Sequence, residues 1–377
     1  MKLATFTHHD SKGWSGAFPT ELDSESTVVF VFGAPGYVDA PAAMDELVAA
    51  FPRSHVVGCS SAGEIFGARV NDQSLSVAVA RFERGRVREA STGIVGGGSS
   101  REAGEALARE LSAPDLRAMF VLSDGLAANG TELLRGIHSV VAGDVTVTGG
   151  LAGDGTAFKR TWVLAGGKAA PGRVVAIGLY GEGVGVSHGS RGGWDTFGTE
   201  RVVTRSEGNV VYELDGEPAL ALYKKYLGDR ASGLPSTALL FPLALRTSSD
   251  DTNMVVRTIL AVDEEKQSMT FAGDVAQESV VQLMRANFDR LIDGAAQASL
   301  SAARPGEGDT LSIAISCVGR RIVLGERTEE EVEAAVEGAP DPRLVGFYSY
   351  GEISPLVKGA CGVLHNQTMT LTRFWEI

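Results

Sequence analysis

The sequence predicts an α/β protein of two related halves, in which mixed β-sheets are flanked by helices. Short apolar runs typical of buried strands alternate with segments of helical period, as in strand–helix–strand units. Three such units end on a glycine followed by an acid, at Gly63-Glu64, Gly153-Asp154 and Gly351-Glu352. The chain has 377 residues, 44% of them hydrophobic, which suffices for two domains with buried cores. We expect domains over residues 1–185 and 186–377, because glycine is dense around this boundary.

The first half contains two of the predicted units. Residues 27–32 (TVVFVF) are typical of a buried strand, and the turn residues that follow end it. A helix comes next, with Met44, Leu47 and Phe51 on one face. The other elements expected in this half are strands at 56–57, 75–82, 87–94, 118–122, 145–148, 173–179 and 184–188, a helix that ends at Leu111, and a helix at 129–141.

The second half is predicted from the same patterns. Residues 278–296 carry apolar side chains at helical spacing, so we expect one long helix there. Thr328 and Glu331 have the spacing of a capping box, which predicts a helix that runs to Val336. The other elements expected are a helix at 218–227 and strands at 238–243, 255–261, 268–271 and 311–317.

The stretch from residue 344 to residue 374 carries the densest set of polar groups between β-prone segments. Loops of this composition more often bind a molecule than merely connect strands. Glu352 could supply a carboxylate to a ligand amine, with the hydroxyls of Tyr348 and Tyr350 orienting it. The alternative is a structural turn in which Glu352 bonds to backbone amides. Residues 57–65 repeat the sequence pattern of residues 345–353, so Glu64 corresponds to Glu352 in the duplication.

Further polar residues at strand ends complete the predicted site, and we expect the strand-ending loops to converge on one cavity. His365, Asn366 and Gln367 interrupt a β-prone run, where a satisfied core network is the alternative. Arg320 could clamp a carboxylate or a phosphate, or simply lie at a solvated strand end. The predicted ligand-binding residues are Cys59, Ser60, Ser61, Glu64, Asp154, Arg320, Tyr348, Tyr350, Glu352, His365, Asn366 and Gln367.

The composition argues against several classes of protein. The 34 basic and 47 acidic side chains give a net charge of −13, unlike a nucleic-acid binder. The 3 cysteines are too few and too scattered for a disulfide framework or a zinc site, so a reducing compartment fits best. The N-terminus lacks the apolar core of a signal peptide, and no run is long enough to span a bilayer. We expect a cytoplasmic protein without membrane insertion.

Catalytic motifs are incomplete. Residues 58–63 resemble a nucleophile elbow, but the closing glycine comes one residue too late for G-x-S-x-G. The glycines at 183–189 miss the dinucleotide-binding spacing, a Walker A motif lacks its lysine, and HExxH does not occur. We therefore expect no enzymatic activity. The alternative is a hydrolase or transferase that uses Cys59 or Ser60.

Several segments, in order along the chain, resemble the FIST family, a bacterial sensory and signal-transduction module with N- and C-terminal parts. Any one of them alone is a weak signal, whereas the ordered set is specific and covers nearly the whole chain. The segments are GCSSAGEI (58–65), GGLAGD (149–154), LDGEPALALY (214–223), FAGDV (271–275), SCVGRRIVLGERTEEEV (316–332), GFYSYGEISP (346–355) and LHNQTMTL (364–371).

The resemblance implies a sensor that binds a small ligand, and amino acids are the ligands suggested for the family. A subset of the family is described as haem proteins that respond to nitric oxide and regulate a histidine kinase. If haem binds here, His188 or His365 would be its axial ligand, held non-covalently because CxxCH is absent. Many FIST modules are fused to output domains, whereas the module uses up this chain. We therefore expect the signal to pass to a separate protein such as a histidine kinase.

Overall fold

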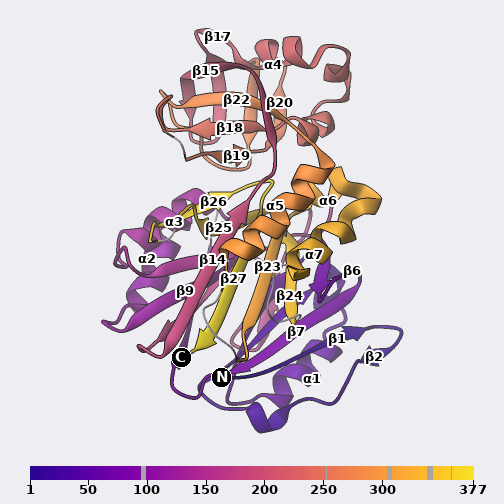
Figure 1. Cartoon of the computed structure of the whole chain (residues 1–377), viewed down its shortest axis with the longest axis vertical. Helices are drawn as coiled ribbons and strands as arrows, with labels where there is room; N and C mark the ends of the chain where they lie inside the picture. Colours follow the sequence, from indigo (N-terminus) through magenta and orange to yellow (C-terminus); the bar gives the residue numbers. More distant parts are fainter. Residues whose placement is uncertain (95–98, 252, 304–307, 338–342, 358) are drawn as a thin grey trace.

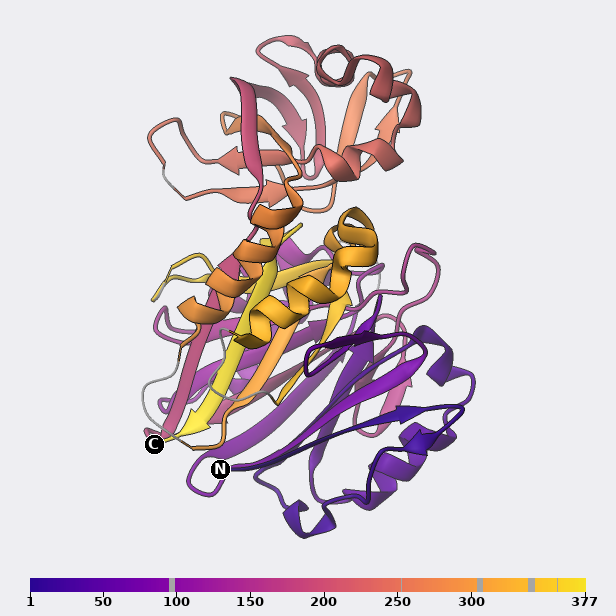
Figure 2. The same ribbon diagram turned by 45° about the vertical axis from the view of Figure 1, so that its right-hand side comes forward.

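The computed structural model describes residues 1–94, 99–251, 253–303, 308–337, 343–357 and 359–377. These residues form four β-sheets, arranged in two bodies (Figures 1 and 2). Three sheets and most of the helices make the larger part, hereafter the three-sheet body, in which both termini lie. Residues 195–285 form the fourth sheet and its helix, hereafter the upper body. The upper body is therefore inserted into the chain of the three-sheet body.

The three sheets of the larger body are mixed. The first has the order β12-β11-β4-β3-β7-β1-β2, the second β26-β25-β10-β9-β13-β8 and the third β14-β27-β23-β24-β5-β6. The first contains β1 (Lys2–His9), β2 (Gly13–Trp14), β3 (Thr27–Gly33), β4 (His55–Ser60), β7 (Ser74–Arg81), β11 (Val163–Ala165) and β12 (Lys168–Ala170). The second contains β8 (Arg86–Gly93), β9 (Leu116–Ser123), β10 (Thr146–Leu151), β13 (Arg173–Tyr180), β25 (Gly351–Pro355) and β26 (Gly362–His365). The third contains β5 (Glu64–Phe66), β6 (Arg69–Asn71), β14 (Val184–Arg191), β23 (Leu311–Cys317), β24 (Leu344–Ser349) and β27 (Met369–Glu376).

The helices cover the outer faces of these sheets (Figure 1). They are α1 (Ala42–Ala50), α2 (Ser100–Leu111), α3 (Gly130–His138), α5 (Phe288–Ser301), α6 (Val318–Leu324) and α7 (Thr328–Glu337). The upper body has the strand order β19-β18-β22-β15-β16-β21-β20, with β17 beside β16. Its elements are β15 (Asp195–Glu207), β16 (Val210–Leu214), β17 (Glu217–Pro218), α4 (Ala219–Leu227), β18 (Leu243–Arg246), β19 (Val255–Arg257), β20 (Ile259–Asp263), β21 (Ser268–Phe271) and β22 (Val280–Arg285).

Each sheet of the three-sheet body contains one strand–helix–strand unit, so the predicted duplication and the α/β class are confirmed. The parallel pairs are β3 with β4, β9 with β10, and β23 with β24. After each unit the chain leaves its own sheet and adds a strand to another. Strand β5 pairs with β24 in the third sheet, β25 pairs with β10 in the second, and β11 pairs with β4 in the first. The three sheets are therefore joined by a cyclic exchange of strands.

A glycine at the same register marks the second strand of each unit. Gly58 lies opposite Val31, Gly149 opposite Val121, and Gly346 opposite Ala314. A Cβ at any of these glycines would overlap the carbonyl oxygen of the residue opposite. These positions need glycine because two backbones approach closely there.

The inner faces of the three sheets pack around one apolar core. Phe30 contacts Phe120 edge to face at 5.1 Å between ring centroids, and Phe120 contacts Phe374 at 6.1 Å. Phe32 stacks on Phe347 at 4.8 Å. These aromatic contacts join the first sheet to the second, the second to the third, and the first to the third. Burial of these rings fixes how the sheets meet and thus where the strand ends lie.

Most predicted elements of the three-sheet body are confirmed, and the main errors fall at the upper body. The helix expected at 278–296 is wrong over its first part, where β22 pairs with β15 and β18. Asn287, whose side chain accepts from the amide of Arg290, marks the true start of α5. The strand expected at 238–243 is instead a 3-10 helix at Ser236–Leu240, followed by β18. Segment 255–261 breaks into β19 and β20 at Thr258.

The predicted boundary at residues 185 and 186 lies within β14, which pairs with β27 in the third sheet. The third sheet also takes β5 and β6 from the first half of the chain. The division into 1–185 and 186–377 stays a prediction. Of the helices in the described ranges, none has the length and apolar character that crossing a membrane would need.

Candidate functional site

The loops that follow the three parallel pairs meet at one place, as the repeated glycine–acid motif predicts. Each loop donates a backbone hydrogen bond to the next, so that the three bonds close a ring. The bonds run from Gly153 N–H to Ser60 O (3.0 Å), from Tyr350 N–H to Leu151 O (3.1 Å) and from Ala62 N–H to Tyr348 O (2.8 Å). The polar groups of segments far apart in the sequence are thereby held together by backbone geometry.

The paired glutamates of the duplication hold this ring from inside the protein. The Ser61 hydroxyl donates to Glu64, and the Ser349 hydroxyl donates to Glu352 at 2.8 Å, so the same serine–glutamate contact occurs in both repeats. Glu352 also accepts from the amide of Thr368 at 3.2 Å. Both glutamates are buried, and burial raises the pKa of Glu64 to about 7 and that of Glu352 to about 8. Their contacts are those of structural carboxyl groups at turns.

A cavity of about 380 Å³, hereafter the inner cavity, lies between the ring and the upper body. One wall is formed by strand ends and helix starts of the three-sheet body, and the other by loops and strand ends of the upper body. From the three-sheet body come residues 125–130, Leu151, Phe158, 317–319, Tyr350 and Asn366. From the upper body come Asn209, Leu239, Thr258, Leu260 and 271–273. Ligands of α/β proteins commonly bind at such carboxyl ends of parallel strands.

Two buried polar atoms at the inner cavity have no hydrogen-bond partner among the described residues, namely Asn366 Oδ1 and Thr258 Oγ1. Asn366 is 1% exposed and Thr258 is 4% exposed. The Asn366 amide nitrogen donates to the His365 carbonyl at 3.0 Å, which leaves Oδ1 as the free end of the amide. A buried polar group without a partner is costly, and both residues line the inner cavity, so a bound molecule that reached these two atoms would remove that cost.

An aromatic pair forms another part of the wall. Tyr350 stacks on Phe158 with ring centroids 4.5 Å apart and an angle of 13° between the planes. The Tyr350 hydroxyl donates to Asp154, which also accepts from the amides of Phe158, Lys159 and Arg160. Asp154 therefore acts on the cavity indirectly, because it fixes the loop that presents Phe158.

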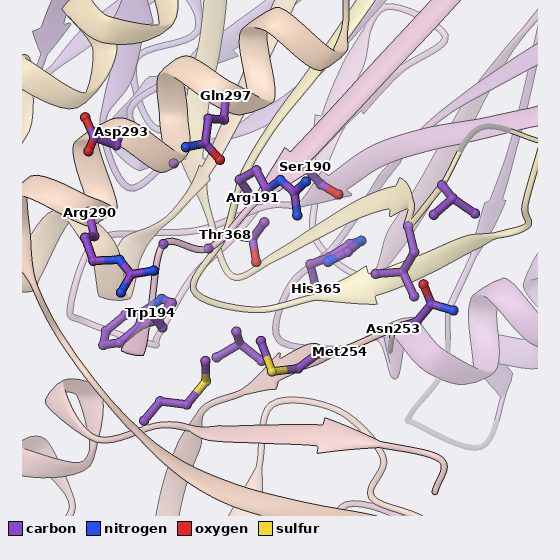
Figure 3. A pocket seen from close by; sticks show the side chains of 17 residues that line it. Ser190, Arg191, Trp194, Asn253, Met254, Arg290, Asp293, Gln297, His365 and Thr368 are labelled. Carbon is purple, nitrogen blue, oxygen red and sulfur yellow. The ribbon is translucent and has the colours of Figure 1, made fainter. Parts of the chain in front are cut away.

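A second cavity, of about 420 Å³ and hereafter the outer cavity, has a different character (Figure 3). Charged side chains line it, among them Arg191, Arg290 and Asp293. His365 also lines it, and its Nε2–H donates to the Ser354 carbonyl at 2.9 Å. Burial lowers the pKa of His365 to about 4, so the imidazole is neutral near pH 7.

The turn at 365–368 contributes to both cavities. His365 and Thr368 line the outer one, whereas Asn366 lines the inner one. Gln367 joins the two bodies, since its Nε2 donates to the Leu239 carbonyl of the upper body at 3.1 Å. Its own carbonyl accepts from Trp194 Nε1 at 2.8 Å. The predicted His-Asn-Gln segment thus lies at the contact between the two bodies.

Arg320 is a buried structural residue, and its contacts leave no role in clamping a ligand anion. Its side chain and that of Glu331 are both 0% exposed, with Nε and Oε1 2.5 Å apart. The guanidinium also donates to the carbonyls of Gly192, Leu291 and Gln367. Glu331 further accepts from Tyr348 Oη at 2.9 Å, and the Thr328 hydroxyl donates to the carbonyls of Arg321 and Gly325, so the expected capping box is wrong although the helix forms. Glu331 turns into the core because Arg320 needs a counter-ion there.

The remaining predicted residues lie in the core beside the ring. Cys59 is fully buried in β4, and burial raises its thiol pKa well above the ordinary value. Ser60 Oγ accepts from the amide of Trp162 at 3.1 Å. His188 lies on β14 opposite Thr372. Of the predicted ligand-binding residues, the structure brings Tyr350 and Asn366 to the inner cavity and His365 to the outer one.

The sequence-based prediction missed one whole wall of the inner cavity. Thr258, Leu260 and Phe271 lie in or beside segments that were predicted only as strands, and Thr258 interrupts the segment predicted as one strand at 255–261. The loop before α3 was also missed, although Asn129 gave a usable signal. Its side chain caps α3 by accepting from the amides of Thr131 and Glu132, and an N-cap after a strand marks a strand end.

The raised pKa of Glu352 predicts a pH dependence of stability. The folded protein keeps this proton up to about pH 8, whereas an unperturbed glutamate releases it near 4.5. The free energy of unfolding should therefore fall as the pH rises between these values, by at most about 1.4 kcal/mol per pH unit for this group. Urea unfolding at pH 5 and pH 8.5 should show a smaller loss for Glu352→Gln than for the parent. Exposed Glu330→Gln is the control, and an equal loss in all three proteins would contradict this prediction.

The comparisons with known proteins agree with the resemblance seen in the sequence. Residues 27–217 match the FIST N domain and residues 219–355 match the FIST C domain. No curated protein matches the chain. Among solved structures, a cyanuric acid hydrolase from A. caulinodans is similar at 9% identity and a TM-score of 0.38, over 100% of this chain and 98% of that one. This likeness is too low to support an inference. The two domain matches cover most of the sequence, and the chain belongs to the FIST family, whose domains are sensory domains of signal transduction.

Proposed function

We propose that this protein senses a small molecule bound in the inner cavity and passes the signal to a separate protein, such as a histidine kinase. The observation that carries the proposal is the pair of buried, unpartnered atoms, Asn366 Oδ1 and Thr258 Oγ1, at one cavity. One atom comes from each body, so a ligand that bonds to both would join them. Concave, largely apolar pockets with a few convergent polar groups are the usual form of small-ligand sites.

The route of the signal follows from how the upper body is attached. The chain crosses between the bodies twice, between β14 and β15 and between β22 and α5 (Figure 1). Arg320 donates to a carbonyl near each crossing, those of Gly192 and Leu291. A ligand that contacts both walls favours the arrangement in which they are close, and thereby biases the position of the upper body. A partner that reads the surface across the two bodies would then respond.

A cavity-filling variant tests this proposal. Leu260 lines the inner cavity and is 45% exposed, so Leu260→Trp should occupy the space without disturbing a core. Val202→Trp, at a 36% exposed upper-body position outside the lining, is the matched control. We expect mass spectrometry to find a small molecule retained from a metabolite extract by the parent and by Val202→Trp. Retention by Leu260→Trp should fall about tenfold or more, and equal retention by all three would refute the inner cavity as the site.

We propose a binding role without catalysis. A nucleophile at Cys59 would need a thiolate, but the thiol is enclosed in the core and its raised pKa keeps it protonated. Ser60 is also buried, and its hydroxyl oxygen accepts a backbone amide. These surroundings favour roles in packing for both residues over the hydrolase or transferase alternative.

A haem-binding nitric oxide sensor is the second candidate, and His365 is the observation in its favour. The ring is neutral, as an iron ligand must be, and its Nε2–H bond to Ser354 would orient it and leave Nδ1 for the metal. Haem would supply the gas-binding iron. The discriminating measurement is an absorption spectrum after haem addition. A Soret band that His365→Ala loses and His188→Ala keeps would establish this candidate, whereas a flat spectrum of the parent would remove it.

A further inference from the structure

We propose that the inner cavity selects a neutral ligand, one that combines a flat apolar part with a hydrogen-bond donor, and that it rejects charged molecules such as zwitterionic amino acids. This inference rests on the proposed function, because it names the class of ligand for the same cavity. It differs from the amino-acid ligand that the family resemblance implies.

The first reason is the absence of charge in the cavity wall. None of the described residues that line it is Asp, Glu, Lys, Arg or His. Cys317, which does line it, stays a neutral thiol because burial raises its pKa. A charged ligand would lose its hydration in this cavity and meet no side chain of opposite charge, which is strongly unfavourable.

The charged groups just behind the wall already make hydrogen bonds within the protein. Asp274 accepts from Asn129 Nδ2 at 3.2 Å and from Arg135 at 3.0 Å. Arg257 donates to the carbonyls of Asp274 and Leu364, at 3.1 and 3.0 Å. A ligand could recruit Asp274 only by breaking its contacts with Asn129 and Arg135.

The N-terminus of α3, which lies at the cavity, does not favour the binding of an anion either. The Asn129 side chain accepts from the amides of Thr131 and Glu132, at 3.0 and 3.1 Å. These are amides that a bound anion would otherwise contact at a helix N-terminus. The cap therefore removes the usual reason for anion binding at this position.

The second reason is the chemistry of the two unpartnered atoms. Asn366 Oδ1 is an acceptor only, since the Nδ2 end of its amide is taken by the His365 carbonyl. Thr258 Oγ1 can accept or donate. A ligand that reaches Asn366 Oδ1 would therefore satisfy it with an N–H or O–H group.

The third reason is the shape and polarity of the rest of the wall. The stacked rings of Tyr350 and Phe158 form a rigid aromatic surface, with centroids 4.5 Å apart. Leu126 and Leu260 also line the cavity and are 43% and 45% exposed. Contact with a flat apolar group would cover these surfaces, which would otherwise remain in water.

Three probes that share a phenyl ring and differ in charge test the proposal: benzamide, benzoate and phenylalanine. Each is titrated into the full chain while protein NMR shifts of the cavity residues are followed. We expect benzamide to bind with a Kd on the order of 1 mM, as suits so small a molecule. We expect benzoate and phenylalanine to bind at least about tenfold more weakly, because each must bury a charge.

A pair of matched variants assigns the binding to this cavity. Thr258→Val removes the unpartnered hydroxyl at nearly constant shape and should weaken benzamide binding by about fivefold to tenfold. Thr148→Val is the control, because the Thr148 hydroxyl is also buried without a partner among the described residues but lies outside the cavity lining. We expect it to leave benzamide affinity unchanged. Both variants should fold, since each removes a buried polar atom that makes no hydrogen bond to the described residues.

The outcomes separate this inference from the proposed function. If benzoate or phenylalanine binds as tightly as benzamide and loses affinity in Thr258→Val, the neutral-ligand inference is wrong and the cavity remains a ligand site. If benzamide fails to bind, or if Thr258→Val leaves its affinity unchanged, the inference is also wrong. The comparison of Leu260→Trp with Val202→Trp would still decide the proposed function.

Discussion

Replacing Arg320 by methionine is expected to lower the free energy of unfolding by about 3–5 kcal/mol, because it leaves Glu331 as a buried charge without its partner. Both side chains are fully buried, and Arg320 also holds the carbonyls of Gly192, Leu291 and Gln367. The substitution therefore removes the hydrogen-bond donor of three backbone carbonyls at the contact between the two bodies. Chemical denaturation followed by circular dichroism measures the loss.

An exposed arginine provides the control for this experiment. Arg327 pairs with Asp289 and Glu330 but is 38% exposed, so Arg327→Met should cost less than about 1 kcal/mol. The double variant Arg320→Met with Glu331→Leu should recover part of the loss, because no unpaired charge then remains. Equal stability of Arg320→Met and the parent would show that the buried pair does not hold the structure together.

Alanine at Gly58, Gly149 or Gly346 is expected to destabilise the protein by about 3 kcal/mol in each case. The added methyl group would overlap the carbonyl oxygen of the neighbouring parallel strand, and backbone atoms can yield only if the strands separate. The three positions occupy the same register in the three units, so the losses at Gly58 and Gly346 should be similar, and the loss at Gly149 should be at least as large because its φ of +141° also strains alanine. Thermal unfolding of the three single variants measures them.

Gly16→Ala is the matched control, because a Cβ there would meet nothing within 4 Å. We expect it to change stability by less than about 0.5 kcal/mol. If one of the three core glycines tolerated alanine as well as Gly16 does, that unit would not share the close strand approach of the other two.

Periodicity predicted the three-sheet body well and failed at the upper body, for physical reasons. Residues 27–33 are buried along their whole length, so the sequence is one apolar run that admits few interpretations. Residues 280–285 carry Val280, Val281, Leu283 and Met284, a spacing that fits one face of a helix as well as a strand. Pairing with β15 and β18 decides in favour of the strand, and sequence alone does not reveal those partners.

The site was predicted in part for similar reasons. Repetition of the glycine–acid frame indicated that distant loops meet, and the hydrogen-bonded ring confirms it. The repeated sequence pattern did not reveal whether each side chain faces the protein interior or the inner cavity. Glu64 and Glu352 face serine hydroxyls inside the protein, whereas Tyr350 and Asn366 reach the inner cavity. The role of Thr258 could not be predicted, because its place in the same cavity as Asn366 depends on how the two bodies dock.

The cyclic exchange of strands has a consequence for folding kinetics. No sheet of the three-sheet body is complete until a strand from another unit arrives, so an isolated unit would expose an unpaired edge and half of a core. Closing the cycle requires contacts between residues as distant as Gly346 and Ile65. Chains dominated by such non-local pairings fold slowly and cooperatively. The arrangement that gathers three loops around one cavity should thus also make this body slow to refold.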